Sequence, residues 1–170
     1  IFYMYRVKPQ IRLSYKLIEG DPTSFDYYTT NADRGYTYGI EGDMRFSIND
    51  NLLFYDRFTI NKTYHSKYSY LDTEIGDRSM SHAPEFCAYG GIEYLYKNFK
   101  FKADHSVNLG YYYDDQSIFK SDPYQLLNIE AEININNLIV SVFSKNVMDE
   151  RYTSRGYYFS LEPSPIDNGG

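Results

Sequence analysis

Residues 99–113 read FKFKADHSVNLGYYY, and this stretch decides the fold class of the protein. Its odd positions, from Phe99 to Leu109, are mostly apolar, whereas its even positions begin with Lys100, Lys102 and Asp104. A period of two places successive side chains on opposite faces of a β-strand, while a helix repeats its apolar residues three and four positions apart. The stretch therefore predicts one long amphipathic strand.

The same period runs through most of the chain. Strong alternation predicts strands at residues 34–48, 125–135 and 1–17. Pro9 cannot donate a ladder hydrogen bond, so it marks a bulge or a local break in pairing in the last of these. Weaker alternation predicts strands at residues 52–64, 86–96 and 138–147. These strands are longer than the ~5–6 residues usual in globular sheets and exceed the ~9–11 residues that cross a bilayer at a tilt. The sequence predicts an all-β fold with long strands.

The connections alternate strictly between short and long. The short ones are tight turns at Asn49-Asp50-Asn51, Lys97-Asn98 and Asn136-Asn137. The long ones are residues 19–33, 65–83, 114–123 and 149 onward. In an antiparallel up-and-down sheet, this order collects all tight turns at one end and all long loops at the other. Outer-membrane barrels have that asymmetry.

Alternation alone leaves open which face is buried. In a soluble barrel or sandwich the apolar face points inward, whereas in a large membrane barrel it faces lipid and the polar face borders water. Asp56 interrupts the apolar phase of residues 52–64, and facing lipid it would cost about 2–4 kcal/mol at most, unless a bulge turns it inward. Six tyrosines near predicted strand ends suit interfacial aromatic girdles: Tyr36, Tyr38, Tyr94, Tyr96, Tyr111 and Tyr113.

Composition excludes several other classes. The 170 residues carry 17 Lys and Arg against 23 Asp and Glu, and a net charge of -6 disfavours a nucleic-acid binder. No run of ~18 apolar residues is present, which excludes a helical membrane span. The single cysteine, Cys87, excludes a disulfide within the chain and a cysteine metal cluster. The chain starts in a strand pattern without a leader, so we expect a piece of a longer protein.

No candidate catalytic group stands out. His65, His82 and His105 lack the spacing of metal ligands, and a packing or solvent-facing role is expected for them. Cys87 has no adjacent base, and neither a Gly-rich phosphate loop nor a Ser-His-Asp order is visible. We therefore expect no enzyme activity, no catalytic residues, no cofactor and no resident metal.

Tyrosines in the long connections are the candidate ligand-binding residues. Tyr27, Tyr28, Tyr68 and Tyr70 lie in predicted outer loops, where aromatic rings stack on aromatic or catecholate ligands. Packing of the loops against themselves explains the same residues equally well, so both interpretations stay open.

Four segments together resemble the C-terminal barrel of TonB-dependent outer-membrane receptors. Residues 142–152, VFSKNVMDERY, resemble a signature near the end of that family. Residues 31–42, NADRGYTYGIEG, and residues 82–86, HAPEF, followed by Tyr94, resemble two of its earlier strands. Residues 131–137 fit its penultimate hairpin, and Glu162-Pro163 fits the approach to its final strand. The segments occur in the family's order and span essentially the whole chain.

The resemblance implies a fold and a function. Residues 1–170 would form a partial transmembrane β-barrel domain, about seven or eight consecutive strands of a barrel of about 22. The plug domain and the final aromatic-ended strand would lie outside the chain. The whole protein would sit in the outer membrane of a Gram-negative bacterium, in contact with lipid. It would import a ferric siderophore, haem or cobalamin with energy delivered through the TonB complex. The resemblance gives Asn146, Asp149 and Tyr152 structural roles.

An alternative from another class is a small closed β-barrel that acts as a binding or adhesion module with its apolar face inward. The number of strands, their closure and the position of the apolar face discriminate between the two hypotheses.

Overall fold

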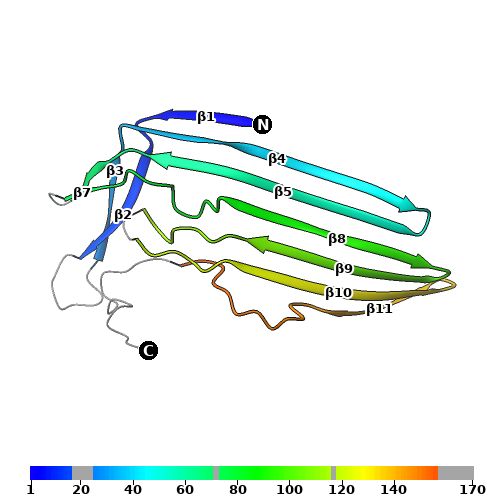
Figure 1. Ribbon diagram of the computed structural model, residues 1–170. Coiled ribbons are helices and arrows are strands. Elements are labelled where there is room, and N and C mark those ends of the chain that lie inside the picture. The colour runs from blue at the N-terminus through cyan, green and yellow to red at the C-terminus, as the bar shows by residue number, and fades with distance from the viewer. Residues whose placement is uncertain (17–24, 71–72, 116–117, 157–170) are drawn as a thin grey trace.

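The computed structural model describes residues 1–16, 25–70, 73–115 and 118–156 (Figure 1). Eleven strands and no helix form in these ranges, which confirms the all-β prediction. In chain order the strands are β1 (Phe2–Val7), β2 (Gln10–Lys16), β3 (Phe25–Asn31), β4 (Arg34–Asn49), β5 (Leu52–His65), β6 (Tyr68–Tyr70), β7 (Thr73–Ile75), β8 (Phe86–Tyr96), β9 (Phe99–Asn108), β10 (Tyr124–Ile135) and β11 (Leu138–Ser144).

Seven strands form one antiparallel sheet in the order β1-β4-β5-β8-β9-β10-β11. Apart from the inserted hairpins β2–β3 and β6–β7, each strand pairs with the next one along the chain, as the up-and-down prediction requires. No pairing joins β1 to β11 among the described residues, so this sheet is open at both edges. A closed barrel is therefore not present in the described part of the chain.

The two ends of the sheet differ as the connections predicted. Figure 1 shows the β4–β5, β8–β9 and β10–β11 turns together at one end and the long connections at the other. Lys97 and Asn136 begin two of these turns with φ of 55° and 57°, the left-handed conformation that tight hairpin turns require. We call the two ends the turn end and the loop end.

The register places the apolar phases of all seven strands on one face. Ile40 of β4 lies opposite Ile60 of β5, and Ala103 of β9 lies opposite Ile129 of β10. We call this the apolar face, and it includes Tyr3, Tyr5, Tyr36, Tyr38, Ile40, Met44, Phe46, Phe54, Phe58, Ile60, Ile92, Tyr94, Tyr96, Phe99, Phe101, Ala103, Leu127, Ile129, Ile133, Val140 and Val142. The polar face carries Glu41, Asp43, Arg57, Lys100, Lys102, Asp104, Glu130 and Glu132.

The predicted strand at residues 1–17 breaks near Pro9, so of the two expected irregularities, a bulge or a break in pairing, the structure has the break. Lys8 has a φ of 50°, and beyond it β2 leaves β4 and pairs with β3 in a separate two-stranded sheet. Strand β3 falls in residues 19–33, which were predicted as a loop, so that prediction was wrong. Its sequence, FDYYTTN, repeats Tyr and Thr at adjacent positions and therefore hides the period of two.

Two other predicted strands are too long. Strand β9 ends at Asn108, and Gly110 follows with a φ of 81°. Tyr111 and Tyr113 therefore lie in a loop beyond the strand, and their prediction as part of the strand was wrong. Strand β11 ends at Ser144 rather than at residue 147, before a turn in which Asn146 has a φ of 51°. The period of two within one strand carries no information about where its pairing with the neighbouring strand ends, so it does not predict the end of the strand.

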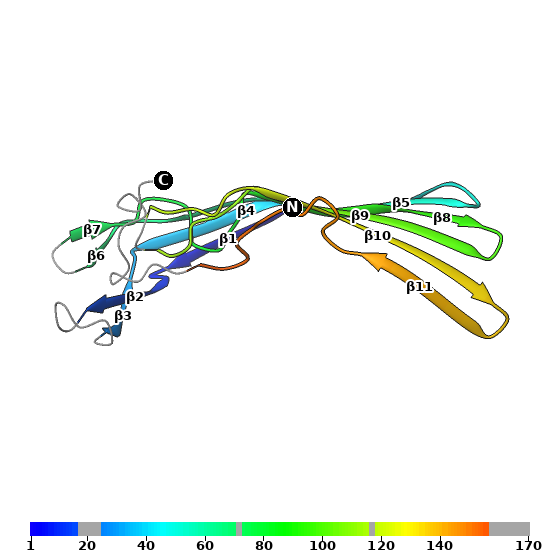
Figure 2. The same ribbon diagram turned by 90° about the horizontal axis from the view of Figure 1, so that it is seen from below.

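The long connections fold into a structured cap at the loop end. We define the cap as the hairpins β2–β3 and β6–β7 with residues 76–85, 109–115 and 118–123. Its core consists of Ile11, Ala32 and Tyr68, with Ile75 packed against them. Figure 2 shows the two hairpins at the same end of the sheet, with β2–β3 standing off from the sheet plane.

Candidate functional site

On the polar face, ion pairs join side chains of neighbouring strands. Arg57 pairs with Asp43 at 2.7 Å, and Lys100 pairs with Glu132 at 3.0 Å. These side chains are partly or largely exposed, so each pair contributes about 1 kcal/mol or less. The polar face therefore has the chemistry of a water-facing surface rather than of a protein core.

One group on the polar face brings three oxygen atoms together from three adjacent strands. Tyr55 of β5 and Tyr89 of β8 both donate their hydroxyl to Oδ1 of Asp104 on β9, the second at 2.9 Å. The other carboxylate oxygen, Oδ2, pairs with Lys102 Nζ at 3.2 Å. The Asp104 side chain is only 14% exposed. This group was not predicted from the sequence, although tyrosines on the polar phase of a strand are a signal that could have indicated it.

The cap lies over the polar face at the loop end. The Met80 amide donates to Thr63 Oγ1 at 3.0 Å, and Thr63 belongs to the polar phase of β5. His65, two residues further on the same face, is completely buried. Its backbone exchanges hydrogen bonds with that of Arg78, at 3.0 and 3.3 Å. Segments far apart in sequence therefore meet on the polar face at the loop end.

His65 is the junction of the cap with the sheet. Its Nε2 lies 3.7 Å from Asp115 Oδ1, its Nδ1 lies 3.2 Å from the Ser66 carbonyl oxygen, and its ring packs 5.5 Å from that of Tyr68. Burial lowers the pKa of His65 below its usual value, and the opposing attraction of Asp115 is smaller. Of the two roles expected for His65, packing and facing solvent, the structure shows packing.

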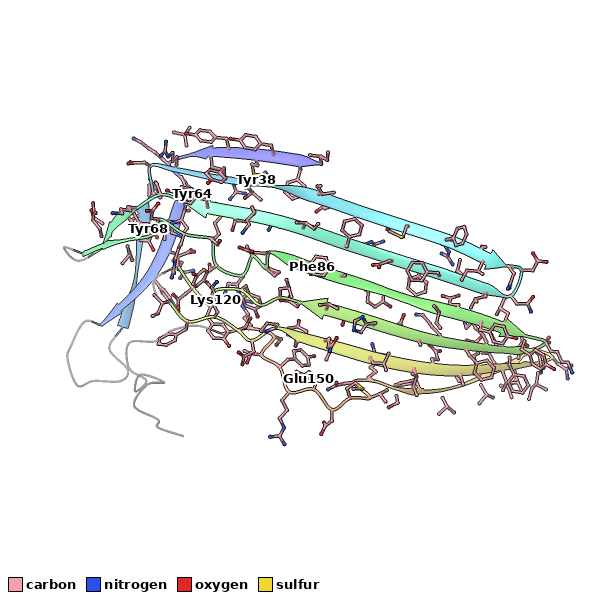
Figure 3. All side chains as sticks on the ribbon, viewed as in Figure 1. Tyr38, Tyr64, Tyr68, Phe86, Lys120 and Glu150 are labelled. Carbon is pink, nitrogen blue, oxygen red and sulfur yellow. The ribbon has the colours of Figure 1, made fainter. Side chains whose placement is uncertain are left out.

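Two cations flank one ring in the cap. Arg78 lies 4.5 Å and Lys120 lies 4.3 Å from the ring centroid of Tyr112. Arg78 also donates to the Asp114 carbonyl oxygen at 2.8 Å. Figure 3 places Lys120 at the loop end together with Tyr64 and Tyr68. The cap thus holds a basic aromatic group at the loop end.

The four predicted ligand tyrosines do not share one environment. Tyr68 is only 4% exposed, and its hydroxyl donates to the Asp115 carbonyl oxygen at 2.5 Å, so it packs inside the cap. Tyr27 is half exposed, with the Arg12 guanidinium 4.0 Å over its ring. The side chains of Tyr28 and Tyr70 lie outside the part of the chain that is described. For Tyr68 the self-packing interpretation holds, because a ring this buried offers no face to a ligand.

Asn146 organises the turn that follows β11. Its Oδ1 accepts the Glu150 amide and its Nδ2 donates to the Glu150 carbonyl oxygen, both at 3.0 Å. Its own amide donates to Asn128 Oδ1 on β10 at 2.9 Å. Tyr152 stacks on Tyr124 of β10 with ring centroids 4.5 Å apart. The segment after β11 is therefore attached to β10 through Asn146 and Tyr152.

The apolar face has aromatic rows near both ends. At the loop end Tyr36 and Tyr64 stack with centroids 4.9 Å apart, and Tyr5 continues that row on β1. At the turn end Tyr94 of β8 lies opposite Phe101 of β9. Aliphatic residues such as Ile40, Met44, Ile60, Ile92, Ala103 and Ile129 lie between the rows.

Asp56 remains on the apolar face, because the one bulge of the β4–β5 pair lies at Ser47 and Asn49. It leans over Gly90, where a Cβ would come 3.0 Å from the Asp56 Cγ atom. Its Oδ1 is buried and accepts no hydrogen bond from any described residue. Asp56 lines a hollow of 270 Å³ with Gly90 and His105.

Comparison with models of known families, with characterised proteins and with solved structures finds no match to the chain. No helix that is long and apolar enough to cross a membrane forms in the described ranges. Within the same ranges, His, Cys, Asp and Glu side chains form no group of three that could hold a metal ion.

Proposed function

We propose that the chain forms part of the wall and outer mouth of a TonB-dependent transporter in the outer membrane of a Gram-negative bacterium. The complete protein would take up a scarce nutrient, with a ferric siderophore as the first candidate and haem or cobalamin as others. It would couple to the TonB complex through a plug domain outside this chain.

The observation that carries the proposal is the uncovered apolar face. Tyr38, Ile129 and Val142 are 46%, 45% and 72% exposed, and the apolar rows continue across all seven strands of the sheet. Soluble monomers rarely expose a contiguous apolar surface of more than a few hundred Å². A bilayer would cover this face without further protein, and the aromatic rows near both ends suit its two interfaces.

The position of the cap supports a transporter rather than a plain anchor. In a barrel with the apolar face outward, the polar face lines the interior. A cap folded over the loop end of that face would then narrow the outer mouth. The basic aromatic group of Arg78, Tyr112 and Lys120 would line the mouth and suit an anionic ligand.

The closed-module alternative requires the opposite orientation. Its apolar face would have to curl inward and become buried as the sheet closed on itself. Neither closure nor burial of that face occurs in the described sheet, and we therefore place this alternative second.

The first test is the behaviour of the full-length protein during purification. We expect it to need detergent, and to migrate faster on a denaturing gel before heating than after, as folded barrels do. Solubility without detergent would contradict the proposal.

The second test locates lipid directly. In a Cys87→Ser background, Ile129→Cys and Glu130→Cys are each labelled with a fluorophore, and the protein is reconstituted in vesicles whose acyl chains carry a quencher. We expect quenching at position 129 and little at position 130, because the two side chains lie on opposite faces of β10. Equal quenching, or the reverse order, would refute the orientation.

A further inference from the structure

A hollow of 270 Å³ interrupts the apolar face between β5 and β9. Asp56 of β5, Gly90 of β8 and His105 of β9 lie in one register row across the sheet. Gly90 leaves the middle of this row without a side chain, and the Asp56 carboxyl group leans over it. A Cβ at position 90 would come 3.0 Å from Asp56 Cγ and 2.7 Å from the Tyr55 carbonyl oxygen. The glycine therefore keeps the hollow open and lets the carboxyl group reach it.

The side chains that line the hollow offer hydrogen-bond acceptors but no donor. Asp56 and His105 are the only polar side chains in this lining. Asp56 Oδ1 is buried and accepts no hydrogen bond from any described residue. His105 Nε2 lies 3.3 Å from Gln125 Oε1, an acceptor, so we assign the proton of the neutral ring to Nε2, which leaves Nδ1 as an acceptor. A buried acceptor without a donor is unfavourable, and a ligand that supplies N–H groups removes this cost.

The rest of the lining is apolar and continues into a second hollow. Phe54 and Ile92 are among the apolar residues of the first hollow. Ile92 and Ala103 also line an adjacent hollow of 420 Å³, which extends toward the turn end past Tyr94 and Phe101. Pockets for small molecules usually measure ~300–1,000 Å³. The two adjacent hollows therefore suit a small ligand with an apolar body.

The lining selects an amine over other classes of ligand. An anion would be repelled by the Asp56 carboxylate, and an alcohol brings a single donor and no positive charge. A metal ion needs more ligands than one carboxylate and one imidazole, and the described residues form no group of three such side chains that could hold one. An ammonium group supplies three N–H donors and a positive charge, and hydrogen bonds between charged groups are the strong ones.

We propose that the hollow beside Asp56 binds the ammonium group of a small amphiphilic amine. The ammonium donates to Asp56 Oδ1 and to His105 Nδ1, while the apolar body of the ligand lies along Ile92 toward Tyr94. A phospholipid headgroup does not fit, because it stays at the membrane surface, whereas Asp56 lies between the aromatic rows of the two ends. The ligand is therefore a free amine rather than an aminolipid of the bilayer.

Binding at this hollow does not rest on the proposed function, because the hollow belongs to the described sheet alone. An amphiphilic amine also dissolves in detergent micelles and in bilayers. It can therefore reach the apolar face even where lipid covers that face.

The test titrates the full-length protein in a non-ionic detergent with 4-phenylbutylamine and follows binding by calorimetry. The neutral 4-phenylbutanol has the same carbon skeleton and serves as the reference ligand, because it enters micelles but carries no ammonium. We expect the amine to bind about tenfold or more tightly than the alcohol, since hydrogen bonds to a charged group are lost with the ammonium. The anion 4-phenylbutyrate should not bind.

Three variants separate the carboxylate from the space around it. Asp56→Asn keeps the size of the side chain and removes its charge, so it should weaken binding of the amine about tenfold or more and change that of the alcohol little. Ala103→Leu keeps the carboxylate but fills the space that the two hollows share, and it should weaken both ligands. Asp43→Asn removes a carboxylate from the polar face and should change neither. Circular dichroism of each variant reports whether it has folded.

The outcomes separate this site from the proposed function. Equal affinity for the amine and the alcohol, or binding of the amine that is unchanged in folded Asp56→Asn, would overturn the site. A detergent-dependent barrel that binds no amine would remove the site and leave the transporter proposal standing. Binding of the amine that depends on Asp56, in a protein that needs no detergent, would keep the site and remove the transporter.

Discussion

At the residue scale, Asn146 shows why a polar side chain occupies a position after a strand. Its φ of 51° is left-handed, a conformation that asparagine tolerates better than most residues. Its amide group also closes a turn by bonding the backbone of Glu150 in both directions. One residue thus fixes both the direction of the chain and its attachment to β10.

We expect Asn146→Ala to lower the free energy of unfolding by about 2 kcal/mol, from about 1 for the lost hydrogen bonds and about 1 for the left-handed backbone. Urea unfolding in detergent measures the change. Asn146→Gly serves as the comparison, because glycine accepts the backbone but makes no side-chain bond, and it should lose roughly half as much. An equal loss in both variants would mean that the backbone conformation costs nothing.

His65 makes the stability of the cap depend on pH. Burial keeps its folded-state pKa below the unfolded value of about 6.5, so the unfolded cap binds a proton more readily than the folded one. The stabilisation is complete above about pH 6.5 and is lost as the pH falls toward the folded pKa. The charged and titratable groups near the ring are Asp115, Arg78, Asp77 and Tyr68.

We therefore expect hydrogen exchange of residues 76–82 to speed up, after correction for the intrinsic rate, as the pH falls from about 7.5 to about 5.5 around the usual histidine pKa. His65→Gln should remove most of this pH dependence. His105→Gln, an exposed histidine on the apolar face, should leave it intact. The same pH dependence in both variants would assign the effect to another group.

At the element scale, strand β8 shows how the apolar face and the polar face of the sheet differ. Gly90 and Gly91 each leave a gap in a row of side chains, and each gap is filled from β5. Asp56 leans over Gly90 on the apolar face, and Tyr55 crosses Gly91 on the polar face. Two glycines in one strand therefore serve two separate groups, one on each side of the sheet.

We expect a new positive charge to lower the free energy of unfolding more on the apolar face of β10 than on its polar face. Ile129→Arg places a guanidinium on the apolar face and should cost about 2–4 kcal/mol if that position lies near the bilayer midplane. Glu130→Arg places the same group on the polar face and should cost less than about 1 kcal/mol. Urea unfolding in lipid vesicles measures both, and similar costs would contradict the assigned faces.

At the scale of the whole molecule, the sheet is defined by its two unpaired edges. β1 and β11 end the strand order, and β11 is exposed along its whole length on both faces. Open edges with free backbone groups are unfavourable in a membrane, where every donor and acceptor must be satisfied. The proposed transporter therefore requires further strands beside both.

In the full-length protein, we expect the β11 amides that do not bond to β10 to exchange with solvent as slowly as those in the middle of β9. A neighbouring strand would protect them, and hydrogen exchange of the folded protein in detergent measures this directly. The amides at the tip of the Asn136-Asn137 turn provide the fast-exchanging reference. Fast exchange along the free side of β11 would show that the sheet ends there.

The sequence by itself determined that the seven strands of the main sheet exist, which face each of their side chains is on, and which end of the sheet carries the tight turns. The period of two in residues 99–108 assigns each side chain to a face without knowledge of any neighbour, because the pleat of a strand is local. The tight turns at residues 49–51, 97–98 and 136–137 then fix which strands are adjacent. These predictions held because each depends on residues close together in the chain.

Only the tertiary structure decided what happens between distant segments. The meeting of Tyr55 with Asp104 depends on a register across β8, and the burial of His65 depends on loops that fold back over the polar face. Tyr68 was a candidate ligand-binding residue in the sequence, but it lies in the core of the cap because the loops fold back on one another. Such contacts join residues tens of positions apart, and a pattern that repeats every two residues holds no information about them.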